Sequence, residues 1–184
     1  EINLLKLKRN INIFRYLYKS NCDINLLTDN ALKFGNEKGD LIITTIIDLD
    51  CKYCHKLVED VSALITMFPD KFLWNVILAG NSVNQVIDQQ FISENWRQLY
   101  LYSKCGISKD KCLKALKHLK FKRKKMRYSN NILEGYKDVL HNLKNIVVKH
   151  YPIILINGII LPQEYVVSDL QYLGLDFFNK DFKI

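Results

Sequence analysis

Residues 41–54 read LIITTIIDLDCKYC and decide the fold that the sequence predicts. Leu41–Ile47 is a run of mainly β-branched residues that follows a turn-rich segment, which is typical of a buried strand. A Cys-x-x-Cys pair comes soon after this run. Beyond the pair, apolar residues recur at helical spacing as far as Pro69-Asp70, which can end a helix. They are Leu57, Val61, Leu64, Ile65 and Phe68.

A second apolar run at residues 72–79 predicts another strand directly after this helix. A strand, a helix and a strand joined by a short return form a βαβ unit, so the two strands should be parallel. We therefore expect residues 41–81 to form the first half of a sheet.

The C-terminal part of the chain carries a hairpin signal. Apolar runs at residues 153–156 and 159–161 flank Asn157-Gly158, and this dipeptide suits a two-residue turn that needs positive φ. A last helix is expected to start near Ser168, which can cap it. Residues 147–184 are therefore predicted to form the second half, with an apolar helix face made by Leu170, Leu173 and Phe177.

Two further segments surround these halves. Residues 1–40 are predicted to be a lead-in, helical at first and then polar and turn-rich at 21–40. Residues 82–146 are mostly helical in pattern, with breaks near Gly106 and 129–131, and are too long for a simple connection. The order β-α-β, helices, β-β-α predicts a thioredoxin fold. This is an α/β domain with a mixed four-stranded sheet, helices on both faces and a helical insertion.

The position of Cys51 and Cys54 predicts thiol chemistry. A helix N-terminus offers unpaired backbone N–H groups and a positive dipole end, and both favour a thiolate at Cys51. We expect Cys51 to attack a substrate disulfide and Cys54, one turn on and more buried, to resolve the mixed disulfide. A lone Cys-x-x-Cys also fits half of a zinc site or a buried structural pair. Zinc would need two more Cys or His ligands.

Tyr151-Pro152 opens the third predicted strand. Proline is compatible with the first residue of a strand, so a plain structural role is one interpretation. In the thioredoxin fold, however, this position holds a cis-proline that faces the cysteine pair and leaves backbone groups free to pair with an extended substrate. Lys52, Tyr53, Tyr151 and Pro152 are therefore the predicted substrate-binding residues.

Several segments resemble DsbA-like thioredoxin domains that follow a membrane-embedded vitamin K epoxide reductase domain in some bacteria, especially Bacteroidetes. They are LKRN at 7–10 with Phe14, FGN at 34–36, CKYC at 51–54, YPIILING at 151–158, LPQEY at 161–165 and SDL at 168–170. The resemblance implies an extracytoplasmic oxidoreductase that exchanges disulfides with protein substrates and with its membrane partner, without a cofactor or metal. Because the chain starts at Glu1, we interpret it as a piece of a longer protein. The resemblance implies that the full-length protein is tethered to the membrane.

Two positions depart from that family. Tyr151 stands where a small or β-branched residue usually precedes the cis-proline, and Asp50 stands where an aromatic residue often precedes the first cysteine. A carboxylate beside Cys51 should raise the pKa of that thiol, whereas Lys52 and the helix terminus should lower it. The direction of electron flow therefore stays open.

The remaining signals leave alternatives. The net charge is +8, and a basic cluster at 117–127 fits a solvated helix face better than a nucleic-acid or anionic-membrane surface, so no nucleic-acid partner is predicted.

Cys105 and Cys112 would form a second disulfide in an exported domain or pack as small core residues in a reducing compartment, and Cys22 is left over. The rival function is a non-catalytic peptide-binding or redox-sensing module.

Overall fold

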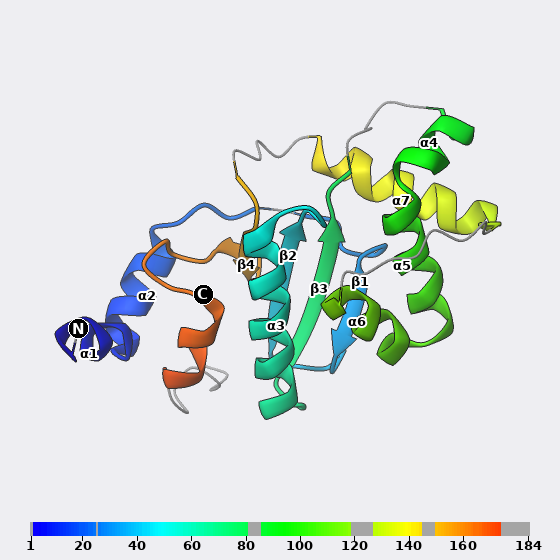
Figure 1. The fold of residues 1–184 in the computed structure, drawn as a ribbon. Coiled ribbons are helices and arrows are strands. Elements are labelled where there is room, and N and C mark those ends of the chain that lie inside the picture. The colour runs from blue at the N-terminus through cyan, green and yellow to red at the C-terminus, as the bar shows by residue number, and fades with distance from the viewer. Residues whose placement is uncertain (1, 25, 81–85, 119–126, 145–149, 174–184) are drawn as a thin grey trace.

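The structure is a computed structural model that describes residues 2–24, 26–80, 86–118, 127–144 and 150–173. Its centre is a five-stranded mixed sheet with the strand order β1-β3-β2-β4-β5, covered by helices on both faces (Figure 1). The strands are β1 (Leu32–Gly35), β2 (Leu41–Ile47), β3 (Phe72–Leu78), β4 (Ile153–Ile156) and β5 (Ile159–Ile160).

The predicted βαβ unit is confirmed. β2 and β3 are parallel neighbours, and helix α3 (Lys52–Met67) connects them. The apolar run of β2 is explained by its central position, since β3 flanks it on one side and β4 on the other. Its two threonines are buried as well, and Thr45 Oγ1 accepts a hydrogen bond from the indole N–H of Trp74 at 2.9 Å.

The sheet has one strand more than the sequence predicts. Residues 21–40 were expected to be polar and turn-rich, but β1 lies within them and pairs antiparallel with β3 at the sheet edge. Leu32 and Phe34 are buried while Lys33 between them is not, which is the period-2 pattern of a strand. Four residues between turns are too few for that pattern to stand out in the sequence.

Helices cover both faces, as predicted. On one face, α3 packs with the N-terminal helix α2 (Ile11–Lys19) and with α6 (Lys109–His118) around the largest apolar core. On the other face, Ile46 and Ile77 pack against Val139 and Leu143 of α7 (Asn130–Leu143). The sheet is therefore buried from two sides over its central strands.

The segment predicted as helical contains four helices among its described residues: α4 (Gln89–Glu94), α5 (Trp96–Ile107), α6 and α7. Ser129 is the N-cap of α7, which confirms the predicted break at 129–131. The first break lies at Ser108 rather than Gly106, because Gly106 is accommodated in the last turn of α5.

The hairpin prediction is confirmed, and a last helix starts near Ser168 as predicted, but Ser168 does not cap it. Asn157 and Gly158 have φ of 48° and 91°, as the two-residue turn requires. The last element among the described residues is a 3-10 helix, η1 (Val167–Tyr172), so Ser168 lies inside it and does not cap it. Instead, the carboxylate of Asp169 accepts the backbone N–H of Val166 at 3.0 Å. Leu170 and Leu173 are buried as expected, and Phe177 lies outside the described residues.

The lead-in forms two helices rather than one. α1 (Ile2–Lys8) ends before Asn10, whose side chain caps α2 by accepting the backbone N–H groups of Asn12 and Ile13. Phe14 and Tyr18 on α2 are buried, and the Tyr18 hydroxyl donates to the carbonyl of Ile156 in β4. The N-terminal segment is thus anchored to the same sheet edge as the hairpin.

Candidate active site

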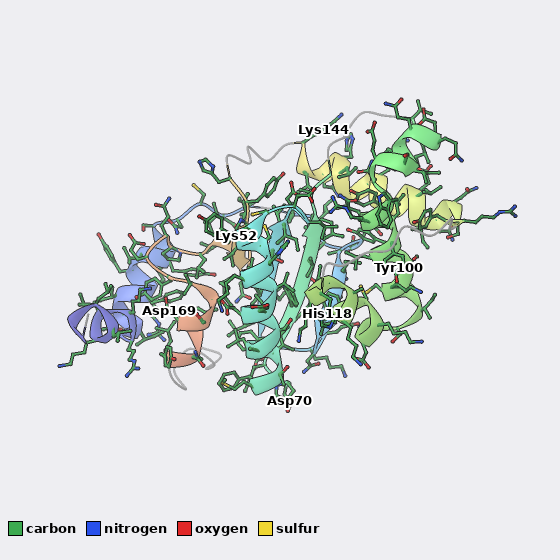
Figure 2. The ribbon with its side chains drawn as sticks, viewed as in Figure 1. Lys52, Asp70, Tyr100, His118, Lys144 and Asp169 are labelled. Carbon is green, nitrogen blue, oxygen red and sulfur yellow. The ribbon has the colours of Figure 1, made fainter. Side chains whose placement is uncertain are left out.

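Cys51 and Cys54 lie where the chain passes from β2 into α3. Cys51 is the N-cap residue, with extended backbone angles of φ −81° and ψ 116°. Its N–H donates to the carbonyl of Asp48 at 3.2 Å, and the N–H of Cys54 donates to the carbonyl of Cys51 at 3.0 Å. Cys51 is half-buried and Cys54 is 1% exposed, so only the first sulfur is open to a macromolecule. Figure 2 marks this end of α3 with the label Lys52.

Tyr151-Pro152 lies against the same sulfur. The peptide bond between the two residues is cis, as expected for this position of the predicted fold. The thiol of Cys51 donates to the carbonyl of Tyr151 across 3.6 Å. The sheet register explains this meeting: Ile153, the first residue of β4, pairs with Ile46 near the end of β2. The two segments, 100 residues apart in the sequence, therefore reach the same end of the sheet.

The other predicted substrate-binding residues surround this point. Lys52 and Tyr53 are exposed on the first turn of α3, with 75% of Tyr53 accessible to solvent. Tyr151 is half-buried, and burial is the main reason why the pKa of its phenol is raised. All six predicted site residues thus lie at one end of the sheet, around a sulfur that solvent can reach.

The two thiols of the pair differ in their environments. Burial, together with the hydrogen bond that its S–H donates to the Cys51 sulfur, raises the pKa of Cys54 to about 12. The backbone N–H of Asp48 opposes this shift by donating to the Cys54 sulfur. Cys54 is therefore a protonated thiol at neutral pH, as a resolving cysteine is before it attacks.

Arg97 of α5 is part of the site, and sequence reasoning missed it. Its guanidinium binds both carboxylate oxygens of Asp50, at 2.9 and 2.7 Å. This pairing lowers the pKa of the Asp50 carboxyl and supplies a positive charge that offsets it next to Cys51. The two residues are 47 positions apart in different segments, and no local pattern signals their contact.

The zinc alternative depends on which side chains surround the cysteine pair. His55 Nε2 lies 3.1 Å from the carbonyl of Leu49, so this imidazole braces the loop before Cys51. Among the described residues, no group of three or more His, Cys, Asp or Glu side chains is arranged to hold a metal ion. A zinc site built on Cys51 and Cys54 therefore has no further ligands in the part of the chain that the structure describes.

Comparisons with known proteins find similarity in structure. No family model matches the chain, and no curated protein does. The catalytic domain of Proteus mirabilis ScsC superposes with a TM-score of 0.61 at 13% identity, over 90% of this chain and 98% of that domain. A compact conformation of Proteus mirabilis ScsC gives a TM-score of 0.62 at 14% identity, over 84% of this chain and 75% of that one. Oxidised BdbD from Bacillus subtilis gives 0.59 at 8% identity, over 87% and 97%.

The chain has a thioredoxin fold. This confirms the predicted fold class, and the similar structures are DsbA- and ScsC-like members of that fold. At identities this low, the similarity defines the thioredoxin fold and not the activity. The division of the chain at residues 40, 81 and 146 and the vitamin K epoxide reductase context stay predictions.

Proposed function

We propose that this thioredoxin-fold domain is a protein thiol–disulfide oxidoreductase. One observation carries the proposal: the half-buried Cys51 thiol sits at the start of α3 against the carbonyl that precedes cis-Pro152, with the buried Cys54 behind it. This arrangement combines an accessible sulfur, a buried second thiol and a cis-proline segment in one place.

The chemistry follows from which sulfur is accessible. In the oxidised pair, a substrate thiolate attacks the Cys51 sulfur, the Cys51–Cys54 bond breaks, and Cys54 leaves as a thiolate that takes up a proton. A second thiolate of the same substrate then attacks the substrate sulfur that is bonded to Cys51, and Cys51 leaves as a thiolate. The substrate is oxidised to a disulfide and the pair is reduced to two thiols. The reverse sequence reduces a substrate disulfide, with Cys51 attacking first and Cys54 resolving.

Substrate recognition is proposed for the surface around Cys51. Tyr151 and Pro152 would pair with an extended segment of the substrate through backbone groups, and Lys52 and Tyr53 would contact its flanking side chains. The exposure of Lys52 and Tyr53 supports this role. The bulk of Tyr151 at the position before the proline would favour substrates with small residues next to the reacting cysteine.

The cellular setting is proposed from the family resemblance. We place the domain outside the cytoplasm, tethered to the membrane in the full-length protein, with a vitamin K epoxide reductase-type domain as the partner with which it exchanges disulfides. Among the described residues, no helix has the length and apolar character needed to cross a bilayer.

The reduction potential of the Cys51–Cys54 pair tests the function. The protein with Cys22, Cys105 and Cys112 replaced by serine is equilibrated with glutathione mixtures, and its free thiols are tagged and counted by mass. We expect the pair to titrate between about −270 and −120 mV, and Cys51→Ser to abolish the transition. A pair that never forms a disulfide, or that is reduced only when the protein unfolds, contradicts the proposal. Peptide binding without thiol exchange would then support the non-catalytic module.

A further inference from the structure

Two more cysteines face each other away from the candidate active site. Cys105 lies in the last turn of α5 and Cys112 in the first turns of α6. The chain reverses tightly between them at Ser108, whose N–H donates to Lys104 O at 2.8 Å and whose carbonyl accepts the N–H of Cys112 at 3.0 Å. Figure 2 marks the two helices with Tyr100 on α5 and His118 on α6.

The two sulfurs are in hydrogen-bonding contact. The single S–H proton of Cys112 has two acceptors within reach, the carbonyl of Leu101 at 3.3 Å and the sulfur of Cys105. When Cys105 is neutral, the carbonyl can accept this proton. When Cys105 is a thiolate, the charged sulfur is the stronger acceptor. The pair can therefore stabilise one negative charge, and that charge resides on Cys105.

The surroundings favour the same site for the charge. Cys112 has no solvent exposure, whereas Cys105 is half-buried. The Cys105 sulfur also accepts the backbone N–H of Lys33 in β1 and lies near the ammonium group of Lys109. Together with the hydrogen bond from Cys112, these contacts outweigh burial and lower the pKa of Cys105 to about 7. Cys105 is therefore more readily a thiolate at neutral pH than an ordinary cysteine.

We propose that Cys105 and Cys112 form a second redox pair, in which the Cys105 thiolate is the attacking group and Cys112 the resolving group. A small-molecule disulfide such as glutathione disulfide is the oxidant. Cys105 attacks one of its sulfurs, the sulfur–sulfur bond breaks, and one glutathione leaves as a thiolate. The leaving glutathione thiolate takes up the proton of Cys112, and the Cys112 sulfur then attacks the Cys105 sulfur and releases the second glutathione as a thiolate. Two cysteines are oxidised, one glutathione disulfide is reduced, and the new bond ties α5 to α6.

The proposal is independent of the function of Cys51 and Cys54, so it is tested in the 184-residue chain with Cys22, Cys51 and Cys54 replaced by serine. The protein is equilibrated with glutathione mixtures, quenched with acid, alkylated and digested. Trypsin places the two cysteines on separate peptides, 105–109 and 112–114, because it cleaves after Lys104, Lys109, Lys111 and Lys114. Circular dichroism before the quench checks that the variant is folded.

We expect the two peptides to be joined by a disulfide at oxidising glutathione ratios. At reducing ratios we expect two separate peptides, each alkylated at its one cysteine. The proposal is overturned if Cys105 carries glutathione while Cys112 is still alkylated at the most oxidising ratio. It is also overturned if neither cysteine reacts in the folded protein.

Alkylation rates test which sulfur attacks. At pH 7, iodoacetamide should modify Cys105 at least about tenfold faster than Cys112, because only Cys105 is accessible and charged. Cys112→Ala removes the S–H donor and should slow the alkylation of Cys105 by about tenfold. Cys112→Ser keeps an O–H donor and should slow that alkylation less. Equal Cys105 rates in the parent and in Cys112→Ala would overturn the assignment of Cys112 as its activating partner.

Discussion

At the residue scale, Cys51 and Cys54 differ in what surrounds each sulfur. Cys51 is open to solvent on one side and contacts Tyr151 on the other, while Cys54 is enclosed by the core. Under the proposed function, this asymmetry would direct a protein substrate to Cys51 and reserve Cys54 for the intramolecular step. The bidentate contact from Arg97 to Asp50 adds a charge balance at the same place, since it sets a cation against the carboxylate that precedes Cys51.

Arg97→Gln should slow the alkylation of Cys51 at pH 7. Removing the guanidinium leaves the Asp50 carboxylate unpaired next to Cys51, and a nearby negative charge disfavours the thiolate. Asp50 is exposed, so we expect an effect of about two- to fivefold at low ionic strength that shrinks with added salt. The measurement is the rate of Cys51 carbamidomethylation as a function of pH.

Two matched variants separate charge from packing in this experiment. Arg97→Lys keeps the cation and should stay close to the parent rate, and Asp50→Asn in the Arg97→Gln background should restore most of the loss. If Arg97→Lys slowed the alkylation of Cys51 as much as Arg97→Gln does, the shape of the side chain would matter and not its charge.

The residues of the site could be predicted from the sequence only where they belong to local patterns. Cys51 and Cys54 follow a strand and open a helix, and Pro152 opens a strand before an Asn-Gly turn. Arg97 lies in a helix with no distinguishing pattern, and its contact depends on how α5 packs against the loop before α3. Long-range contacts of this kind are determined by tertiary structure.

At the scale of elements, long periodic runs and the Asn-Gly turn signal predicted correctly, whereas a short strand without such a turn signal was not predicted. The seven residues of β2, the sixteen of α3 and the Asn157-Gly158 turn appear as expected. β1 was missed because four residues carry too little periodicity. The residue type of Ser168 suits a helix cap, but the backbone N–H of Val166 is satisfied by the carboxylate of Asp169 instead.

The hairpin turn makes a specific demand on glycine. Gly158 has φ of 91°, and a Cβ there would lie 3.1 Å from Oδ1 of Asp23. We expect Gly158→Ala to lower the free energy of unfolding by about 1–2 kcal/mol, because an L-residue with a side chain is strained in the left-handed region. Urea denaturation monitored by circular dichroism measures the loss.

Gly106→Ala is the matched control for this prediction. Gly106 lies in the last turn of α5, and a Cβ at this position would meet no atom within 4 Å. Alanine there restricts the unfolded chain and fits the helix, so we expect it to be neutral or to stabilise by up to about 1 kcal/mol. The test is which variant has the lower free energy of unfolding. A Gly158→Ala protein as stable as Gly106→Ala would contradict the prediction.

At the scale of the whole molecule, the helices between the two halves of the thioredoxin fold extend the site. Helix α5 carries Arg97 near one end and Cys105 near the other, about 12 Å apart along its axis at 1.5 Å per residue. One end contacts the loop before Cys51, and the other closes against α6 next to β1 (Figure 1). That α5 spans these two places was not predictable, because its packing partners come from segments distant in sequence.

The stability of the reduced protein should fall as the pH rises above about 9. Burial and the hydrogen bond that its S–H donates to the Cys51 sulfur raise the pKa of Cys54 from its ordinary value near 9 to about 12. A raised pKa means that the folded state holds its proton more tightly than the unfolded chain does. The stabilisation is therefore complete below pH 9 and is lost progressively as the pH approaches 12. Cys112 shifts in the same direction, and burial raises the pKa of Tyr18 and Tyr136 as well.

Cys54→Ala isolates the contribution of this thiol from the others. We expect the free energy of unfolding of the reduced parent to fall by about 1–3 kcal/mol more than that of Cys54→Ala between pH 8 and pH 11. Both proteins are unfolded in urea under a strong reductant, so that disulfides do not contribute to the comparison. Because Cys112 and the tyrosines are common to both proteins, their titration cancels in the difference. Parallel pH profiles for the two proteins would mean that Cys54 titrates in the folded state as it does in the unfolded chain, and the assignment of Cys54 as a buried, proton-holding resolving thiol would then fail.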